Sequence, residues 1–221
     1  MLAYVIALPL EVLVITALLR GEYRRYPMIF IYCVVDLITT VIEIQPAMAA
    51  RTNPAAMKQW AQIYWYNERI MQVLVFLLVI SLVYYATAHM RPRRTLLAAI
   101  IGGTALVAAV SFWIHYDPTQ PIGRYMTRWT RELNFYGAIL DLGLWALLIG
   151  SRKKDYKLLL VTGALGIQFT GGAIGQSIRD MSPNLVAVAS DLVMVTNFAR
   201  LYIWYQAFRT KPQPSPPAVS T

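Results

Sequence analysis

The chain has 221 residues, of which 57% are hydrophobic and 14% are charged, and its formal net charge is +9. Ordinary soluble domains carry about 25% charged residues, so this composition excludes a soluble domain as the bulk of the chain. The positive charge does not indicate nucleic-acid binding, because the Lys and Arg residues gather at the ends of apolar stretches rather than on one polar face.

Seven apolar stretches fill almost the whole chain, and each approaches or exceeds the roughly 20 residues that a helix needs to cross a bilayer. They predict an all-α, polytopic membrane protein in which residues 1–208 form one bundle of seven transmembrane helices. In chain order, the predicted helices are residues 2–19, 26–46, 55–88, 95–115, 130–150, 157–178 and 184–207.

The first and third helices have distinctive sequences. A cleavable signal peptide begins with basic residues, whereas Arg20 and Arg24 follow the first apolar run, so a retained helix is expected. Nothing breaks the third helix between Pro54 and His89. At 1.5 Å per residue it should be about 50 Å long and project beyond the outer headgroups.

The basic residues also predict the orientation of the chain. Loops after the first, third, fifth and seventh helices are richer in Lys and Arg than the opposite loops. Short basic loops stay in the cytoplasm, so we expect the N-terminus outside, the C-terminus inside, and a plasma (inner) membrane location. The basic inner surface should contact anionic lipid headgroups. Residues 209–221 are Pro-rich and predict a disordered cytoplasmic tail.

A weak internal repeat relates the two ends of the chain. The sequence ALLRGEYRRYPMIFIY at residues 17–32 and the sequence ALLIGSRKKDYKLLLV at residues 146–161 share an apolar end, a glycine, a basic cluster and a new apolar run. Glu11 and Asp141 also hold similar places in their helices. The pattern permits a parallel three-plus-one-plus-three arrangement, and chance similarity between two basic loops is the alternative.

Polar residues at bilayer depth are the main candidates for a binding or proton-transfer site. A charge at the bilayer centre costs roughly 2.5 to 3.5 kcal/mol, so such residues normally face the bundle interior. The acids outnumber the single deep base, so some must be protonated, hydrated or partnered by amides. The alternative role is interhelical hydrogen bonding that fixes packing. The predicted ligand or proton site comprises Glu11, Asp36, Asp141, Asp191, Gln168, Asn197 and Arg200.

Spacing along the helices sharpens this prediction. Asp36 and Glu43 are seven residues apart and share a helix face, as do Asn134 and Asp141. Each pair can connect the bilayer midplane to the outer side. Arg200 is the natural counter-ion for one of the acids.

A second polar group lies near the outer helix ends. If Pro121 starts a helix, Arg124, Arg128 and Arg131 recur at i, i+4 and i+7 and share one face. The alternative is a set of arginines that hold lipid phosphates. The expected outward-facing polar mouth comprises Glu68, Arg69, Arg124, Arg128, Arg131 and Glu132.

Several chemistries are excluded by the sequence. His89 and His115 should lie a bilayer apart, so they cannot jointly hold a haem or a metal, and Cys33 is the single cysteine. The seventh helix has no lysine for a retinal Schiff base. No Walker or Gly-x-Ser-x-Gly motif is present, so we predict no metal, cofactor or catalytic residue. A lipid-modifying enzyme would lack an adjacent nucleophile and base.

The leading functional hypothesis is that the bundle binds a small solute or ion in a polar intramembrane cavity and moves it with proton coupling. The alternative is a non-transporting sensor or accessory subunit that holds a membrane-protein partner or another copy of the chain. That alternative is motivated by the glycine-rich sixth helix, where Gly171 and Gly175 allow close helix approach.

Overall fold

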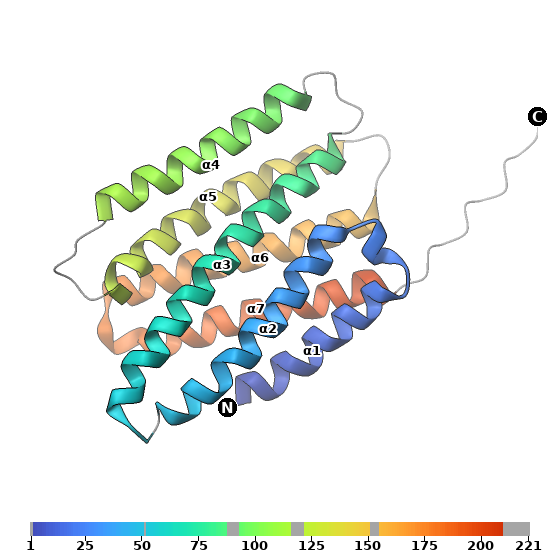
Figure 1. Cartoon of the computed structure of the whole chain (residues 1–221). Helices are drawn as coiled ribbons and strands as arrows, with labels where there is room; N and C mark the ends of the chain where they lie inside the picture. The colour runs from blue at the N-terminus through green and yellow to red at the C-terminus, as the bar shows by residue number, and fades with distance from the viewer. Residues whose placement is uncertain (1, 51, 88–92, 116–121, 151–154, 210–221) are drawn as a thin grey trace, which may run out of the picture.

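The computed structural model describes residues 2–50, 52–87, 93–115, 122–150 and 155–209, and the regular structure in these ranges is entirely helical (Figure 1). The predicted tail therefore lies outside the described residues from residue 210 onward. The long helices are α1 (Leu2–Leu19), α2 (Pro27–Ala49), α3 (Pro54–Ala86), α4 (Arg93–His115), α5 (Ile122–Gly150), α6 (Tyr156–Met181) and α7 (Val186–Arg209). Short 3-10 helices, η1 (Glu22–Arg24) and η2 (Pro183–Leu185), follow α1 and α6.

The predicted all-α membrane bundle is confirmed. Among the described residues, six helices are long and apolar enough to cross a membrane, and α1 is a shorter apolar helix of 18 residues. The largest boundary difference is at α5, which begins at Ile122 rather than at residue 130. The segment before residue 130 belongs to the same helix, and its Arg128 binds Asp180 of α6.

Six of the helices form a closed ring. In the order α1, α2, α3, α5, α6 and α7, each helix packs against the next, and α7 packs against α1. The remaining helix, α4, packs against α3 and α5 from outside and forms the margin of the bundle in Figure 1. It is the least buried of the six long apolar helices.

The chain direction divides this ring into two halves. Successive helices run in opposite directions, so α1 and α3 are parallel and α2 is antiparallel to both (Figure 1). After α4 returns the chain, α5, α6 and α7 repeat the same order of directions. The halves meet at two seams, α3 against α5 and α1 against α7, which both join parallel helices. This topology agrees with the three-plus-one-plus-three arrangement suggested by the sequence repeat.

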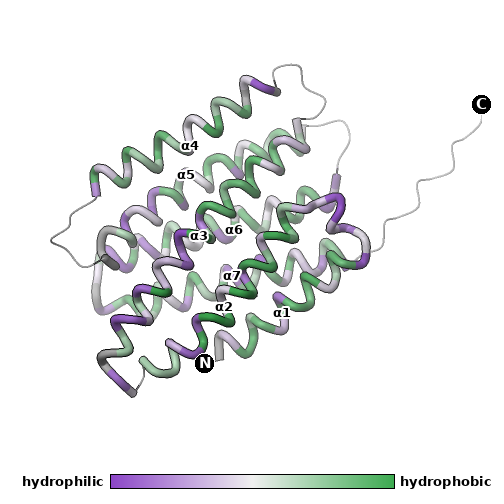
Figure 2. Tube along the Cα trace, in the orientation of Figure 1, coloured by the Kyte–Doolittle hydropathy of each residue, from purple (hydrophilic) through white to green (hydrophobic). Residues whose placement is uncertain are grey.

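The apolar core fills the half of the bundle near η1, which is the side predicted to be cytoplasmic. Trp204 is fully buried there, and its indole Nε1 donates to the carbonyl oxygen of Val161 at 3.2 Å. Figure 2 shows hydrophobic residues along long stretches of every helix. The core side chains include Val14, Leu18, Ile29, Leu78, Val79, Leu82, Val161, Leu165 and Leu201.

Ion pairs brace the same end of the bundle. Lys157 Nζ lies 2.5 Å from Glu22 Oε1, and Arg25 Nη2 lies 2.8 Å from Asp155 Oδ2. The hydroxyl of Tyr26 donates to Asp155 at 3.4 Å, and burial raises the pKa of Tyr26, which keeps this hydroxyl protonated. These contacts join the connection after α1 to the start of α6, so they tie the two halves together on the predicted inner side.

Candidate functional site: a polar cavity between the two halves

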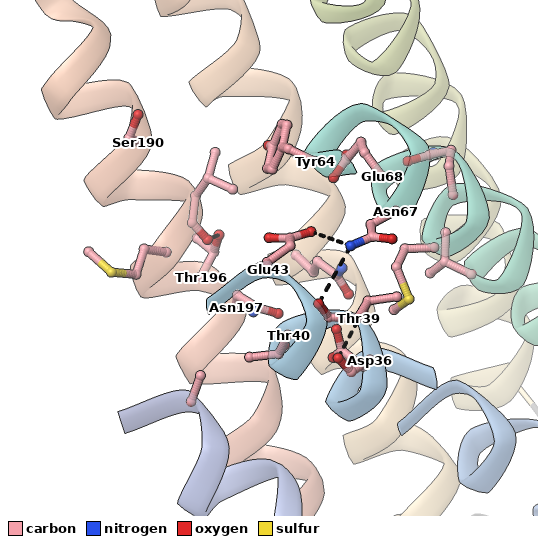
Figure 3. A pocket seen from close by; sticks show the side chains of 18 of the residues that line it. Asp36, Thr39, Thr40, Glu43, Tyr64, Asn67, Glu68, Ser190, Thr196 and Asn197 are labelled. Atoms are coloured by element: carbon pink, nitrogen blue, oxygen red, sulfur yellow. Dashed lines mark hydrogen bonds between the residues drawn. The ribbon is translucent and has the colours of Figure 1, made fainter. Parts of the chain in front are cut away.

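A polar cavity of about 670 Å³ lies inside the ring, in the half of the bundle opposite the apolar core. All six ring helices line it. Figure 3 shows polar side chains of α2 and α3 at this cavity, with Ser190, Thr196 and Asn197 on α7. Its outer limit includes Trp60 and Val186, and Val186 is exposed. The cavity therefore extends from mid-bundle toward the side predicted to be extracellular.

The floor of the cavity is a charged layer around Arg200, which is fully buried. Its Nη2 lies 2.6 Å from Asp36 Oδ2, and its Nη1 donates to the hydroxyl of Tyr32. The guanidinium carbon lies 4.9 Å from the ring centroids of both Tyr32 and Trp204, so cation–π attraction adds to the ion pair. Because Asp36 is on α2 and Arg200 is on α7, this layer joins the two halves.

Glu11 is held inside the first half. It is 1% exposed, and its Oε1 accepts a hydrogen bond from the hydroxyl of Thr40 at 3.1 Å. Its Oε2 is buried and has no hydrogen-bond partner among the described residues. One carboxylate oxygen thus lines the cavity with its hydrogen-bonding capacity unused.

Glu43 is the next acid outward along α2. Its Oε1 accepts a hydrogen bond from Asn67 Nδ2 at 2.8 Å, and Asn67 also reaches the carbonyl oxygen of Thr39 at 3.5 Å (Figure 3). Asn67 is buried on α3. The acid is therefore fixed between two helices of one half by a neutral donor.

Glu68 of α3 and Arg179 of α6 bring opposite charges to the cavity lining. Both line it, and Arg179 attracts Glu68 electrostatically. Arg179 also donates to Ser190 Oγ at 2.8 Å and to Gln176 Oε1 at 3.5 Å. Arg179 is thus held by neutral side chains of α6 and α7, and it adds one positive charge to the cavity lining.

The charges of the cavity are consequently unbalanced. Four acids and Arg179 line it, and among these acids Asp36 forms an ion pair with Arg200 of the second half. Glu11 and Glu43 instead receive their hydrogen bonds from Thr40 and Asn67, which are neutral. The net result is two acids without a matched cation in their hydrogen-bonding shells.

Two of the predicted site acids lie elsewhere, so the expectation that the deep acids share one cavity is wrong for Asp141 and Asp191. Asp191 is exposed, because the cavity face of α7 carries Ser190 and Asn197 and a helix turns about 100° per residue. Asp141 is 3% exposed and lines a separate groove of about 680 Å³ formed by α5, α6 and α7. There it faces Gly166, where an added Cβ would lie 2.7 Å from Asp141 Oδ2.

The two predicted amides, Gln168 and Asn197, do line the cavity. Gln168 Nε2 donates to the hydroxyl of Tyr32 at 3.3 Å, which adds a contact between α6 and α2. Its Oε1 is buried without a partner among the described residues. Gln168 therefore offers the cavity a free acceptor beside the charged floor.

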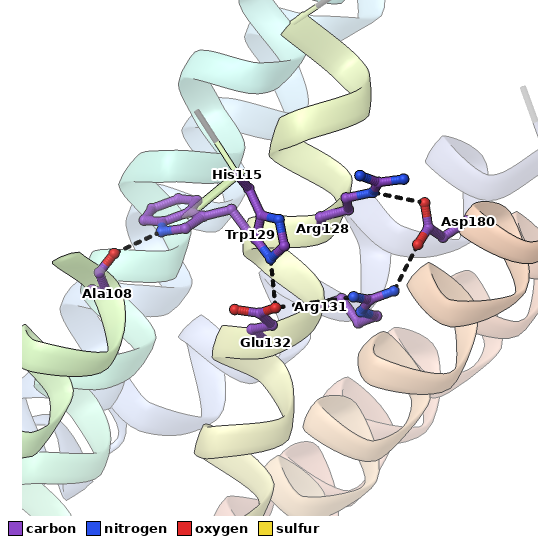
Figure 4. A network of polar contacts seen from close by, with 7 residues as sticks. All are labelled: Ala108, His115, Arg128, Trp129, Arg131, Glu132 and Asp180. Atoms are coloured by element: carbon purple, nitrogen blue, oxygen red, sulfur yellow. Dashed lines mark hydrogen bonds and ion pairs between the residues drawn. The ribbon is translucent and has the colours of Figure 1, made fainter. Parts of the chain in front are cut away.

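The predicted outer mouth is largely a separate network rather than a rim of the cavity. Arg128 Nε and Arg131 Nη1 bind the two carboxylate oxygens of Asp180 at 3.1 and 2.8 Å, and Glu132 Oε1 lies 2.6 Å from His115 Nε2 (Figure 4). These contacts join α4, α5 and α6.

Among the predicted mouth residues whose side chains the structure describes, Glu68 alone lines the cavity. Arg69 does not line it, and its guanidinium carbon lies 4.8 Å from the centroid of the Tyr66 ring. The Arg124 side chain is outside the described part of the structure. Arg128 and Arg131 do not line the cavity because their side chains bind Asp180 of α6 instead.

Sequence reasoning missed several cavity residues. Thr39 and Thr40 lie between Asp36 and Glu43 at the i+3 and i+4 positions of α2, so the polar stripe that these four residues form was a usable signal. The sixth predicted helix ends at residue 178, but α6 continues to Met181 and includes Arg179, which lines the cavity.

These features define a multi-pass integral membrane protein with a polar cavity between two three-helix halves. Among the described residues, no group of three or more His, Cys, Asp and Glu side chains is arranged to hold a metal ion, and Cys33 is buried and free. His89 lies outside the described residues. No protein-family model, curated protein or solved structure matches the chain.

Proposed function

We propose that the protein binds a small solute or ion in this cavity and moves it across the membrane with proton coupling. The observation that carries the proposal is the pair Glu11 and Glu43, two acids in the lining whose donors among the described residues are neutral. Acids in such surroundings bind cations or exchange protons, which is the chemistry that coupled transport needs. The cavity volume also falls within the roughly 300 to 1,000 Å³ typical of small-molecule sites.

The two-half topology supports a transport cycle. Transporters built from two related halves bind their substrate at the interface and expose it by rocking one half against the other. Here the cavity lies on the predicted outer side, while the apolar core and the Lys157–Glu22 pair close the inner side. Opening inward requires these inner contacts to separate. Because Asp36 and Arg200 belong to different halves, the distance between them changes when one half moves against the other.

The test is uptake into proteoliposomes with an imposed pH gradient. The radiolabelled probes are putrescine, choline, alanine and glutamate, which represent a dication, a monocation, a zwitterion and an anion. We expect the gradient to drive uptake of at least one probe, and Glu11→Gln combined with Glu43→Gln to lower that uptake at least tenfold. Asp191→Asn, an exposed acid outside the cavity, is the matched control and should leave uptake unchanged. Wild-type uptake that is indifferent to the gradient for every probe would contradict proton-coupled transport.

A second candidate, an accessory or sensor subunit, is favoured by the groove that contains Asp141. The groove lies on the outside of α5, α6 and α7, and its lining is mostly apolar or small. Asp141 Oδ1 is buried there with no partner among the described residues. A partner helix with a hydrogen-bond donor at that depth would satisfy it.

Purification in a mild detergent tests this second candidate. The accessory function predicts a stoichiometric membrane protein that copurifies with the wild type and is lost from Gly166→Leu, which fills the groove beside Asp141. Recovery of the wild-type protein alone, together with active uptake, favours the transporter.

A further inference from the structure

The cavity retains negative charge after its internal pairs are counted. Among the described residues, four acids line the cavity, against Arg179 in the lining and Arg200, which binds Asp36, so the acids exceed the arginines by two. Glu11 and Glu43 are left with neutral donors. A ligand that complements this lining is cationic and carries positive charge at two places.

The geometry favours an organic cation over a bare metal ion. Calcium and magnesium need several oxygen ligands at about 2.0 to 2.6 Å from one point. In the part of the chain that the structure describes, no cluster of three or more acidic, His or Cys side chains provides such a point. The cavity of about 670 Å³ also has room for a molecule rather than an ion.

The unsatisfied polar atoms indicate N–H groups on the ligand. Glu11 Oε2 and Gln168 Oε1 are both buried acceptors without a partner among the described residues, and both residues line the cavity. An unsatisfied buried acceptor is destabilising, so a ligand that donates to these atoms binds more tightly than one that does not. A primary ammonium donates three hydrogen bonds, whereas a quaternary ammonium donates none.

The two acids are separated along the cavity. The hydrogen bond from Thr40 of α2 places the Glu11 carboxylate at the depth of Thr40. Glu43 lies three residues after Thr40 on α2. Three residues of α-helix correspond to a rise of about 4.5 Å. A short aliphatic chain spans that separation, so one molecule with an amino group at each end can reach both acids.

Aromatic side chains line the outer part of the same cavity. Trp60, Tyr64 and Trp65 succeed one another on α3, with ring centroids 5.8 Å apart for Trp60 and Tyr64 and 5.0 Å apart for Tyr64 and Trp65. Aromatic faces attract cations and also cover aliphatic carbon. This wall is suited to a protonated amine that passes from outside toward Glu43.

We infer that the ligand of the cavity is a short aliphatic diamine, whose two ammonium groups bind Glu11 and Glu43. This inference rests on the proposed binding function of the cavity and specifies the substrate class. The deeper ammonium donates to Glu11 and Gln168, and the outer ammonium donates to Glu43 beside the aromatic wall.

Isothermal titration calorimetry of the purified full chain in nanodiscs tests the inference. The probes are putrescine, n-butylamine, choline, alanine and glutamate, so that n-butylamine matches the carbon chain of putrescine with one amine fewer. We expect putrescine to bind at least tenfold more tightly than n-butylamine and choline. Glu11→Gln and Glu43→Gln should each weaken putrescine at least tenfold and bring it close to n-butylamine. Asp191→Asn should leave its affinity unchanged.

The outcomes separate the ligand class from the function itself. Equal affinities for putrescine and n-butylamine, or a Glu43→Gln variant with unchanged putrescine affinity, overturn the two-point diamine. Binding of alanine or glutamate with no response to either amine overturns the cationic class and leaves a binding cavity in place. A wild type that binds none of the five probes and transports none of them contradicts both proposals. Size-exclusion chromatography of each variant shows whether it is folded, and either glutamine variant alone is sufficient for the test.

Discussion

The cavity and the outer network of α4, α5 and α6 use the same kinds of residue in opposite ways. In the network, Asp180 receives two arginines, and Glu132 lies 2.6 Å from His115. In the cavity, Glu11 and Glu43 receive neutral donors. The side chain of Asp180 is 22% exposed, whereas Glu11 is 1% exposed. Paired charges near the surface brace helices, while unmatched acids in a buried cavity leave capacity for a ligand.

The largest loss of stability is expected from the charged floor, where the cavity acid Asp36 forms an ion pair with Arg200. Arg200→Met leaves Asp36 unpaired inside the bundle, and breaking such a buried pair typically costs about 3 to 5 kcal/mol in unfolding free energy. Denaturant unfolding in detergent micelles measures this loss. Combining Arg200→Met with Asp36→Asn should recover much of it, because no lone charge then remains.

Arg209→Met provides the matched control for that prediction. Arg209 is exposed in the last turn of α7, where its guanidinium carbon lies 6.0 Å from the Tyr205 ring centroid. Its loss should change stability little. If Arg200→Met were as stable as this control, the Asp36–Arg200 pair would not stabilise the bundle, and the prediction would be wrong.

A smaller effect is expected from the packing of the cavity wall. A Cβ at Gly137 would lie 2.5 Å from the ring of Phe169, which lines the cavity. Overpacking of this kind costs about 1 to 3 kcal/mol, so Gly137→Ala should lower stability and displace the ring. Thermal unfolding and putrescine binding measure the two consequences. Gly143→Ala on the same helix meets no atom within 4 Å and should be neutral. Equal behaviour of the two variants would argue against a close-packed wall.

The smallest effect is expected in the outer network. Asp180→Asn removes the acid shared by Arg128 and Arg131, and partly exposed ion pairs contribute about 0.2 to 1 kcal/mol. Stability should fall by no more than that, and putrescine affinity should not change. A large loss of putrescine binding from Asp180→Asn would contradict the claim that the outer network braces the helices without taking part in ligand binding.

The helices and the deep counter-ion were predictable from the sequence because both depend on local patterns. Apolar runs of membrane length fix the helices, and a single deep base among several acids must meet one of them, as Arg200 meets Asp36. The weak sequence repeat permits the two-half order, but seven alternating helices produce the same order of directions without any repeat. These features need no knowledge of how the helices are rotated about their axes.

The membership of the cavity was less predictable because it depends on helix rotation. Ser190 and Asp191 are neighbours in sequence, yet one lines the cavity and the other is exposed. Asn134 and Asp141 share a face of α5, but only Asn134 of these two lines the cavity. Asp141 lies deeper along the helix, where it packs against Gly166 of α6 in another groove. Depth and spacing identify polar residues in the bilayer, and helix packing decides which of them meet.

The closed apolar half has an electrical consequence. A cavity that opens to the outer solution takes the potential of that solution, so the membrane voltage falls mainly across the apolar half beneath Asp36 and Arg200. One elementary charge that crosses the full voltage changes its energy by about 2.3 kcal/mol per 100 mV. If the protein transports the dication proposed above, this ligand crosses most of the field as it leaves the floor, and its transport rate should depend strongly on the membrane potential.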